Sequence, residues 1–332
     1  MPLFSRLRFL AKCWLLLASL SFSLAAQAQE SHVKSWPQSF RPSTQAKIVL
    51  VQQGGGGREF IYHTENFALH SLTALNQRNL ALFATTAESV PSVIKRLPLP
   101  LLGMPKDGRA KVYIFPDQDS FVAAGGPKEA AGYYSGRKQA IMLRADTFLS
   151  PPPPSGSRLP PKADYGLLVH EFTHLCMHRD LAHYPTWFQE GVAEYLAAMH
   201  ETGGVYQFSK VPSSIKRRIK RHLPNDQDHI VLPGIAETMA LSSEQWRKRI
   251  EQGEAENHYR SYGTSLLIVH TLFHGGSKRR AATREFLAKI QQRPPVKQAD
   301  QALIPLDERS ALQKRIVDYW RPRGLRLEFS SP

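Results

Sequence analysis

The chain has 332 residues, with 43 Lys and Arg against 28 Asp and Glu and a formal net charge of +15. This length is enough for one large or two modest domains with ordinary hydrophobic cores. Two cysteines are too few for a small cystine-stapled protein, and no internal repeat is visible.

Residues 1–28 have the pattern of a secretory signal peptide. Arg6, Arg8 and Lys12 give a basic start, and an apolar run of about thirteen residues leads to the small-x-small pattern Ala26-Gln27-Ala28. We expect cleavage after Ala28 and a secreted or periplasmic protein. An uncleaved membrane anchor is the alternative, although the run is short for a membrane span.

Cleavage would leave Cys176 as the single cysteine of the mature chain, because Cys13 is removed with the signal. The mature chain would therefore contain no internal disulfide. We expect Cys176 to be a small buried hydrophobic residue.

Residues 29–162 predict an N-terminal α+β subdomain that begins with a loose polar leader. The expected elements, in chain order, are a strand over Lys47–Gln52, a strand over Glu59–His63, a helix over Leu72–Leu97, a strand over Lys111–Pro116 and a strand over Gln139–Arg144. The first two strands should pair across the intervening glycine run. Pro91 should kink or restart the helix.

Residues 163–332 predict two further helices and a mostly helical C-terminal subdomain. A proline-rich loop separates this part from the last strand. The two helices are expected over Ala163–His178 and Thr186–Met199. Leu266 to Phe273 should form part of a buried helix, because the run is apolar but too short for a membrane span.

The first of these helices carries His170-Glu171-Phe172-Thr173-His174, and Glu190 follows sixteen residues later. Two histidines four residues apart lie on one face of a helix, so both imidazoles can meet one metal ion. A third ligand from the second helix would leave one position of a tetrahedral zinc site open for water. Glu171 is rotated about 100° from His170 and can face that water. The alternative is a surface helix with two unrelated histidines.

The segment Trp187-Phe188-Gln189-Glu190-Gly191-Val192-Ala193-Glu194-Tyr195 resembles the second metal-ligand helix of the gluzincin metallopeptidases, which include thermolysin and the zinc aminopeptidases. The resemblance covers two short motifs. It implies a Zn²⁺ cofactor with His170, His174 and Glu190 as ligands. It also implies that Glu194 accepts the free imidazole N–H of a ligand histidine, with an ordinary solvated charge as the alternative. The interval between His174 and Glu190 is shorter than in those relatives.

Asp180 is a competing third ligand, because it lies six residues after His174, the offset used by the metzincin peptidases. Those enzymes need a glycine midway to turn the chain back to the metal, and Met177 occupies that position. We therefore favour Glu190. His178 lies on the helix face of the two histidines but one turn too far to bind the same ion, so we expect it to be peripheral.

The order of a helix and short strands before the histidine-bearing helix is similar to the upper half of a zincin. This resemblance implies an α+β zincin-like fold with a small mixed sheet above the active-site helix. The edge strand of that sheet would bind extended substrate through backbone hydrogen bonds, and we expect Gln139–Arg144 to be that edge. Ala131-Gly132-Tyr133-Tyr134 also looks like part of a family of uncharacterised exported gluzincin-like domains.

Together these motifs favour an exported zinc metallopeptidase that acts on peptide or protein. Zinc would acidify a water molecule and polarise the scissile carbonyl, while Glu171 would act as general base. Tyr262, or alternatively Tyr259, would donate to the oxyanion, since Tyr262 fits the Tyr-x-x-Ser that opens the corresponding helix in the uncharacterised domains. Either tyrosine could instead pack in the core. The chain lacks the Gly-x-Met-Glu-Asn motif of the zinc aminopeptidases, which favours an endopeptidase.

Two other functions are compatible with the sequence. The first is a zinc hydrolase of a non-peptide bond. The second is a zinc-stabilised cell-envelope binding protein without turnover, whose basic amphipathic helix over Lys210–His222 would lie on anionic lipid or cell-wall polymer. Alternatively, the apolar stripe Val211, Ile215 and Ile219 packs on the core and the charges face water. Export argues against a physiological nucleic-acid partner, and we expect a monomer.

Overall fold

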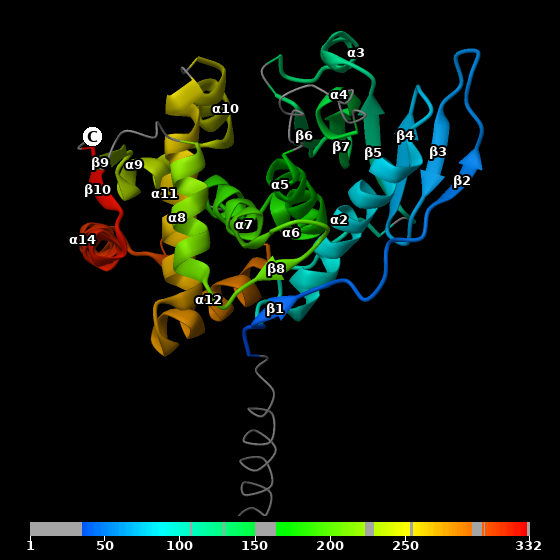
Figure 1. Cartoon of the computed structure of the whole chain (residues 1–332). Helices are drawn as coiled ribbons and strands as arrows, with labels where there is room; N and C mark the ends of the chain where they lie inside the picture. Colours follow the sequence, from blue (N-terminus) through cyan, green and yellow to red (C-terminus); the bar gives the residue numbers. More distant parts are fainter. Residues whose placement is uncertain are drawn as a thin grey trace, which may run out of the picture.

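The computed structural model describes residues 35–106, 108–128, 130–149, 164–222, 229–252, 255–293, 301 and 303–330. The predicted signal peptide and the proline run lie outside these residues. Figure 1 shows a mixed α+β molecule with a sheet on one side and the C-terminal helices on the other. Across the described ranges, no helix has both the length and the apolar composition of a membrane span.

A six-stranded mixed sheet occupies the N-terminal half, in the order β2-β3-β4-β5-β7-β6. Strand β5 runs parallel to both of its neighbours, and the other adjacent strands are antiparallel. The strands are β2 Val49–Gln52, β3 Phe60–His63, β4 Phe67–Ser71, β5 Ala110–Phe115, β6 Gly132–Ser135 and β7 Ala140–Arg144. The predicted pairing of β2 with β3 is confirmed, but β4 and β6 were not predicted.

The prediction that Gln139–Arg144 forms the edge of the sheet is wrong, because β7 lies between β5 and β6. Residues Ala140 to Leu143 are all buried, as expected for an internal strand that is covered on both faces. The edge is the short strand β6, which contributes a glycine, two tyrosines and a serine. Its four residues are too few and too polar to be recognised by periodicity.

Helix α2 spans Gln77–Arg96 and packs against α5, which spans Tyr165–Cys176. Asn76 caps α2 by accepting hydrogen bonds from two backbone N–H groups, so the helix begins later than the predicted Leu72. It is not restarted at Pro91, which lies buried inside a continuous helix.

Helix α7 spans Thr186–Met199, the predicted range, and lies between α5 and α11. The close approach of α7 to α11 depends on Gly191, because a Cβ at that position would lie 2.5 Å from the Ser265 carbonyl oxygen. The predominantly helical C-terminal part is formed by α8 Val211–Arg221, α9 Ile235–Ala240, α10 Ser243–Gln252, α11 Ala255–His274, α12 Ser277–Ile290 and α14 Arg309–Trp320.

Shorter elements complete the described fold. They are the helices α3 Gln118–Ala123, α4 Ala145–Phe148 and α6 His178–Leu181, the 3₁₀ turns η1 Leu306–Glu308 and η2 Arg321–Arg323, and the strand pairs β1 Ser39–Phe40 with β8 Tyr206–Gln207 and β9 His229–Leu232 with β10 Arg326–Phe329.

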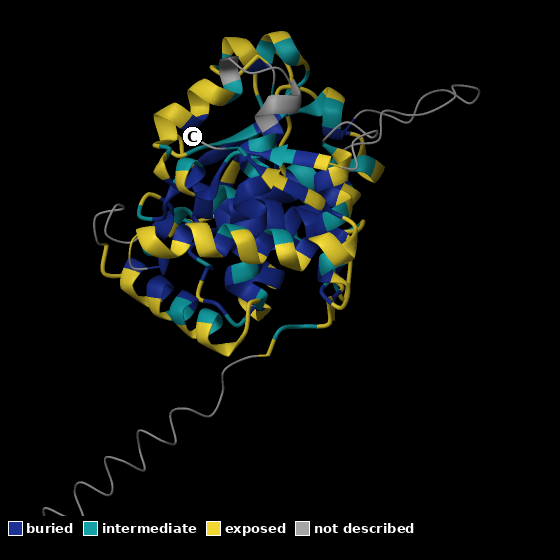
Figure 2. Ribbon diagram, turned by 90° about the vertical axis from the view of Figure 1, so that its left-hand side faces the viewer, coloured by how far each residue is buried: buried dark blue, intermediate teal, exposed yellow. Residues whose placement is uncertain are grey.

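A single hydrophobic cluster runs from the sheet through α5 and α7 to the C-terminal helices. Phe172 of α5 joins its parts, since its ring packs edge-on against Phe67 of β4 and against Phe83 of α2, with centroids 4.8 and 6.1 Å away. Figure 2 shows buried residues filling the middle of the molecule and exposed residues on the outer faces of the helices. The core therefore fixes α5 and α7 from both sides.

Candidate metal centre

Helix α5, which carries the two histidines, begins after an N-cap residue, Asp164. The side chain of Asp164 accepts hydrogen bonds from the backbone N–H groups of Gly166 (3.0 Å) and Leu167 (3.2 Å). These bonds satisfy donors that a helix N-terminus otherwise leaves free. The helix is shorter at both ends than the predicted range, and α6 begins two residues after it ends.

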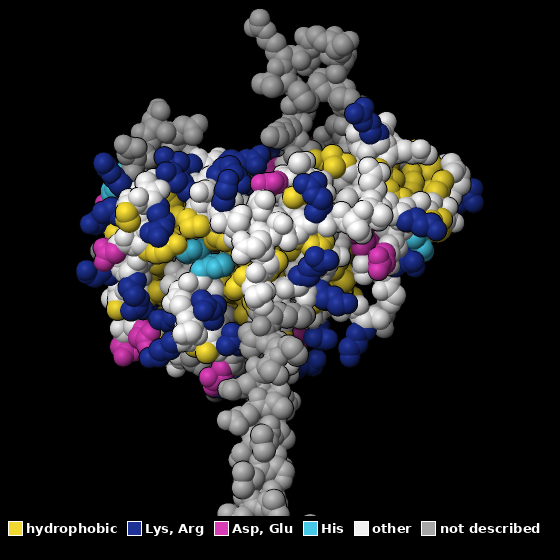
Figure 3. Space-filling view, turned by 60° about the horizontal axis from the view of Figure 1, so that its bottom comes forward, with side chains coloured by type: hydrophobic (Ala, Val, Ile, Leu, Met, Phe, Trp, Pro, Cys, Tyr) yellow, Lys and Arg dark blue, Asp and Glu magenta, His cyan; other side chains and the backbone are white. Residues whose placement is uncertain are grey.

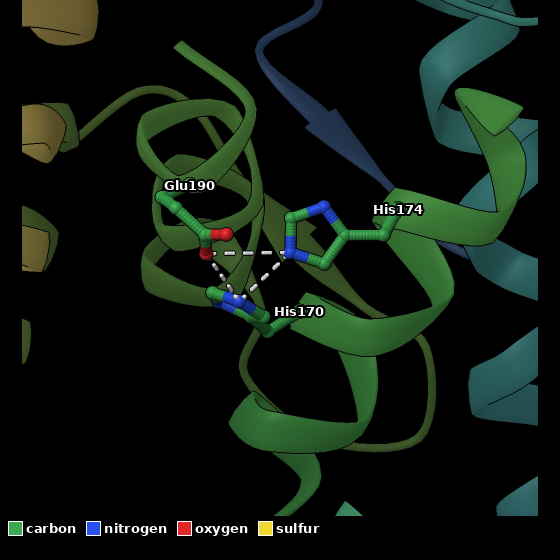
Figure 4. A group of neighbouring side chains, drawn as sticks. All are labelled: His170, His174 and Glu190. Carbon is green, nitrogen blue, oxygen red and sulfur yellow. Dashed lines mark hydrogen bonds and ion pairs between the residues drawn. The ribbon is translucent and has the colours of Figure 1, made fainter. Parts of the chain in front are cut away.

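His170, His174 and Glu190 point toward one another from α5 and α7 (Figure 4). The Nε2 atoms of the two histidines are 3.1 Å apart, and Glu190 Oε2 lies 3.1 Å from His170 Nε2 and 3.4 Å from His174 Nε2. Ligand atoms about 2.05 Å from a tetrahedral zinc ion would be separated by about 3.3 Å. The three side chains, called the metal-binding group below, could therefore hold a metal ion, and their spacing is close to that of a tetrahedral site.

The charges at this group attract a cation. Burial opposes the charged form of His170, but its hydrogen bonds to Glu190 and Glu194 outweigh that effect and raise its pKa to about 10. Burial likewise disfavours the Glu190 carboxylate, yet the two histidines lower its pKa to about 2. In the metal-free protein His170 is thus protonated, and its positive charge compensates the neighbouring carboxylates as a metal cation would.

Glu171 lies beside the metal-binding group and contacts the sheet. Its Oε2 accepts a hydrogen bond of 2.6 Å from the backbone N–H of Tyr134 on β6. The carboxylate is buried, and this desolvation raises its pKa, although the neighbouring His170 and His174 act in the opposite direction. A carboxylate with a raised pKa accepts a proton more readily than an exposed one.

Glu194 is held by a buried polar network that spans four helices. Its Oε1 lies 2.9 Å from His170 Nδ1, so the predicted contact with a histidine is present. Arg218 of α8 donates from Nε and Nη2 to its two oxygens at 2.8 and 2.9 Å, and Tyr259 of α11 donates at 2.8 Å. Burial would raise the pKa of Glu194, but Arg218 outweighs it and holds that pKa well below its usual range.

The sequence analysis did not identify Arg218, although the pattern contained a signal for it. Arg218 lies three residues after Ile215 and seven after Val211, on the apolar face of α8, where an unpaired charge would be costly. A glycine in the first turn of α5 provides the space, since a Cβ on Gly166 would lie 2.7 Å from Arg218 Nη1. A cation on an apolar stripe therefore indicated a buried acidic partner.

The other candidate residues have contacts of their own near the metal-binding group. The ring of Tyr262 lies 5.8 Å from that of His170, whereas the hydroxyl of Tyr259 is engaged by Glu194. His178 hydrogen-bonds through Nδ1 to the hydroxyl of Tyr134 and lies outside the metal-binding group. Asp180 also lies outside that group, and its carboxylate is 3.4 Å from Arg179.

Cys176 is fully buried and unpaired, which confirms that it acts as a small core residue. Comparison with models of known protein families and with curated protein sequences finds no match to this chain. The case for a metal centre therefore rests on the His170, His174 and Glu190 group itself.

Zinc binding should release a proton from His170. With a pKa raised to about 10, the imidazole is protonated at about pH 8 in the metal-free protein, and a metal ion needs its neutral form. We expect about one proton to be released, and the apparent zinc affinity to rise about tenfold per pH unit between about pH 7 and 9. Calorimetric titration in buffers of different ionisation enthalpy measures the number of protons released.

The Glu190→Gln variant removes both a metal ligand and a carboxylate that supports the charged imidazole, so it should bind zinc more weakly and release less than one proton on binding. Zinc binding by the wild type without proton release, or with an affinity independent of pH, would contradict the assignment of His170.

Arg218→Met should weaken zinc binding by about 10- to 100-fold, because Glu194 loses its main counter-charge and no longer holds His170 in place. Breaking a buried ion pair by removing one partner also costs about 3–5 kcal/mol of folding free energy. Titration against a chelating dye and chemical denaturation measure the two effects. The matched control is Arg217→Met, which removes the neighbouring exposed arginine and should change neither quantity.

The double variant Glu194→Gln with Arg218→Met removes both charges and should recover much of the lost stability while its zinc affinity stays low. If Arg218→Met binds zinc as tightly as the wild type, the network does not support the metal-binding group.

Proposed function

We propose that this protein is a zinc-dependent peptidase of the gluzincin type. The proposal rests on one arrangement: two histidines and a glutamate converge from two helices, with Glu171 buried beside them and hydrogen-bonded to the edge of a sheet. His170, His174 and Glu190 would hold the zinc ion. A zinc ion bound there would polarise the scissile carbonyl and lower the pKa of a water molecule to about 7.

Glu171 is the proton carrier in this proposal. Its carboxylate would take the proton of the attacking water and later deliver it to the leaving amine. The raised pKa favours the first of these steps, since a carboxylate of ordinary acidity would accept a proton less readily. The backbone N–H of Tyr134 fixes one carboxylate oxygen, which leaves the other oxygen for the water.

The open edge of β6 supports a peptide substrate. Ala131 accepts a hydrogen bond from Arg144 on the β7 side, so by alternation the backbone groups of Gly132 and Tyr134 face the open side. The Tyr134 N–H is already bonded to Glu171, so the backbone groups of Gly132 and the carbonyl of Tyr134 are those that a peptide would use. An extended peptide can bind to such an edge as an added strand. Because Tyr134 also contacts Glu171, a peptide bound there would have its backbone next to the proton carrier.

A cavity of about 640 Å³ adjoins this position. Tyr134, His178 and Gln189 are among its polar lining residues, and Leu181, Tyr184 and Met239 are among its apolar walls. Such a lining favours an apolar substrate side chain. The ring of Tyr134 stacks near His174, with centroids 6.3 Å apart, so the cavity and the metal-binding group share one wall.

Tyr262 is the proposed donor to the oxyanion. Its ring lies beside His170 and is packed edge-on by Trp246 at 5.3 Å, while its side chain keeps partial exposure. Burial and the nearby Glu190 raise the pKa of the phenol well above its usual value, so it remains a hydrogen-bond donor. Tyr259 is less suited, because its hydroxyl already donates to Glu194.

Glu171→Gln should abolish peptide hydrolysis while zinc binding is kept, because the amide cannot accept the water proton. We expect a loss of at least about 100-fold in kcat/KM. Proteome-wide cleavage profiling with wild type and variant identifies substrates, and a peptide made from one cleaved site gives the rate. Glu244→Gln on the exposed face of α10 is the matched control. A variant that contains zinc and cleaves as fast as the wild type would exclude this role.

Tyr262→Phe should reduce kcat on the same peptide by about 100-fold or more, with KM and zinc content little changed, because the lost hydrogen bond forms only as the oxyanion develops. Tyr113→Phe, on β5, is the control for loss of a phenol elsewhere in the fold. Unchanged kcat in Tyr262→Phe would mean that this tyrosine only packs against His170.

A further inference from the structure

A large basic groove lies along α8 and shares no lining residue with the cavity beside the metal-binding group. It has a volume of about 1400 Å³ and is bounded by the start of α5, the end of α7, one side of α8 and η2. Its exposed or half-exposed cations, which we call the α8 cations, are Lys216, Arg217, Lys220, Arg221 and Arg323. Glu201 is the one acidic residue among the described residues that line it.

Concavity and a low acidic content together distinguish this groove. The other large basic hollow, of about 1210 Å³ beside α2, contains both Glu65 and Glu88 among its cations. Figure 3 shows Lys and Arg side chains scattered over a whole face of the molecule, with few Asp and Glu among them. Scattered surface charge attracts any anion weakly and is screened by salt. The α8 cations instead line one hollow, where several can contact the same ligand.

The α8 cations are only weakly neutralised by the protein. Lys216 donates to the backbone carbonyl oxygen of Arg323, and Arg217 lies 3.4 Å from the hydroxyl of Ser214, neither of which carries a charge. Arg221 is 3.8 Å from the nearest oxygen of Asp164, at the limit of an ion pair. Anionic groups entering the groove would therefore meet cations that still have free donors.

The packing of α8 argues against a lipid bilayer as the partner. An amphipathic helix binds a membrane by inserting its apolar face. In this helix Val211, Ile215 and Ile219 are all buried in the core, which confirms the packing alternative of the sequence analysis. The side of α8 that remains is polar and concave, so it cannot rest on a flat membrane with several cations in contact.

We propose that the α8 groove binds a soluble linear polymer of phosphate groups. Arginine forks pair with phosphate through two hydrogen bonds, and three of the five α8 cations are arginines. The volume far exceeds the space that one phosphate needs, which favours a chain with repeated charges.

The lining argues against single-stranded nucleic acid as the ligand. Its recognition would need exposed aromatic faces for base stacking, and Tyr165 is the one half-buried tyrosine on the described walls.

The test measures binding of the full chain to fluorescently labelled linear polyphosphate at near-physiological salt. The groove variant replaces Lys216, Arg217, Lys220 and Arg221 with glutamine and keeps Arg218, which holds Glu194. The control variant replaces Lys278, Arg280, Arg284 and Lys289 of α12 with glutamine, so both variants lose the same charge. Zinc content and thermal unfolding check that both are folded.

We expect the groove variant to bind at least about tenfold more weakly than the wild type and the control variant to change by less than about threefold. Inorganic phosphate should compete only at far higher phosphate concentration. Equal loss in both variants would show that net charge alone drives binding and would overturn the proposal. Tighter binding to phosphatidylglycerol vesicles or to oligothymidylate than to polyphosphate, lost in the groove variant, would also overturn it.

Discussion

A buried carboxylate and the groups that compensate it hold the centre of this molecule together. An ionised side chain removed from water is tolerated only when it is paired and hydrogen-bonded, and Glu194 receives a histidine, an arginine fork and a tyrosine. These partners come from α5, α8 and α11, while Glu194 belongs to α7. This one carboxylate therefore connects four helices by hydrogen bonds and orients the imidazole of His170 toward His174 and Glu190.

The second fixed relation joins this helical half to the sheet. Glu171 reaches from α5 to the backbone of Tyr134, so the free edge of the sheet and the proposed proton carrier cannot move apart without losing a hydrogen bond. The same strand contributes the Tyr134 ring, which lies beside His174 and bonds to His178. These contacts connect the sheet edge, Glu171 and the metal-binding group, as the proposed catalysis by positioned groups would require.

The α8 helix contributes to the network around Glu194 and to the basic groove through two different faces. Its buried face supplies Arg218 to the network around Glu194, and its outer face supplies the α8 cations to the groove. Residues three or four apart lie on the same face of a helix, whereas residues between them lie on other faces. One basic segment can therefore neutralise an internal acid with one face and attract an external polyanion with another.

Local patterns in the sequence determined the main helices and the candidate metal ligands, because helix periodicity and capping act over a few residues. The four-residue spacing of His170 and His174 placed both rings on one face, and the bounds of α7 were predicted without error. Tertiary structure decided which strand lies at the edge, which arginine is buried and which tyrosine bonds to Glu194, since each depends on residues distant in the chain. Strand β6 is too short to recognise alone, and Arg218 finds Glu194 only once α7 and α8 pack together.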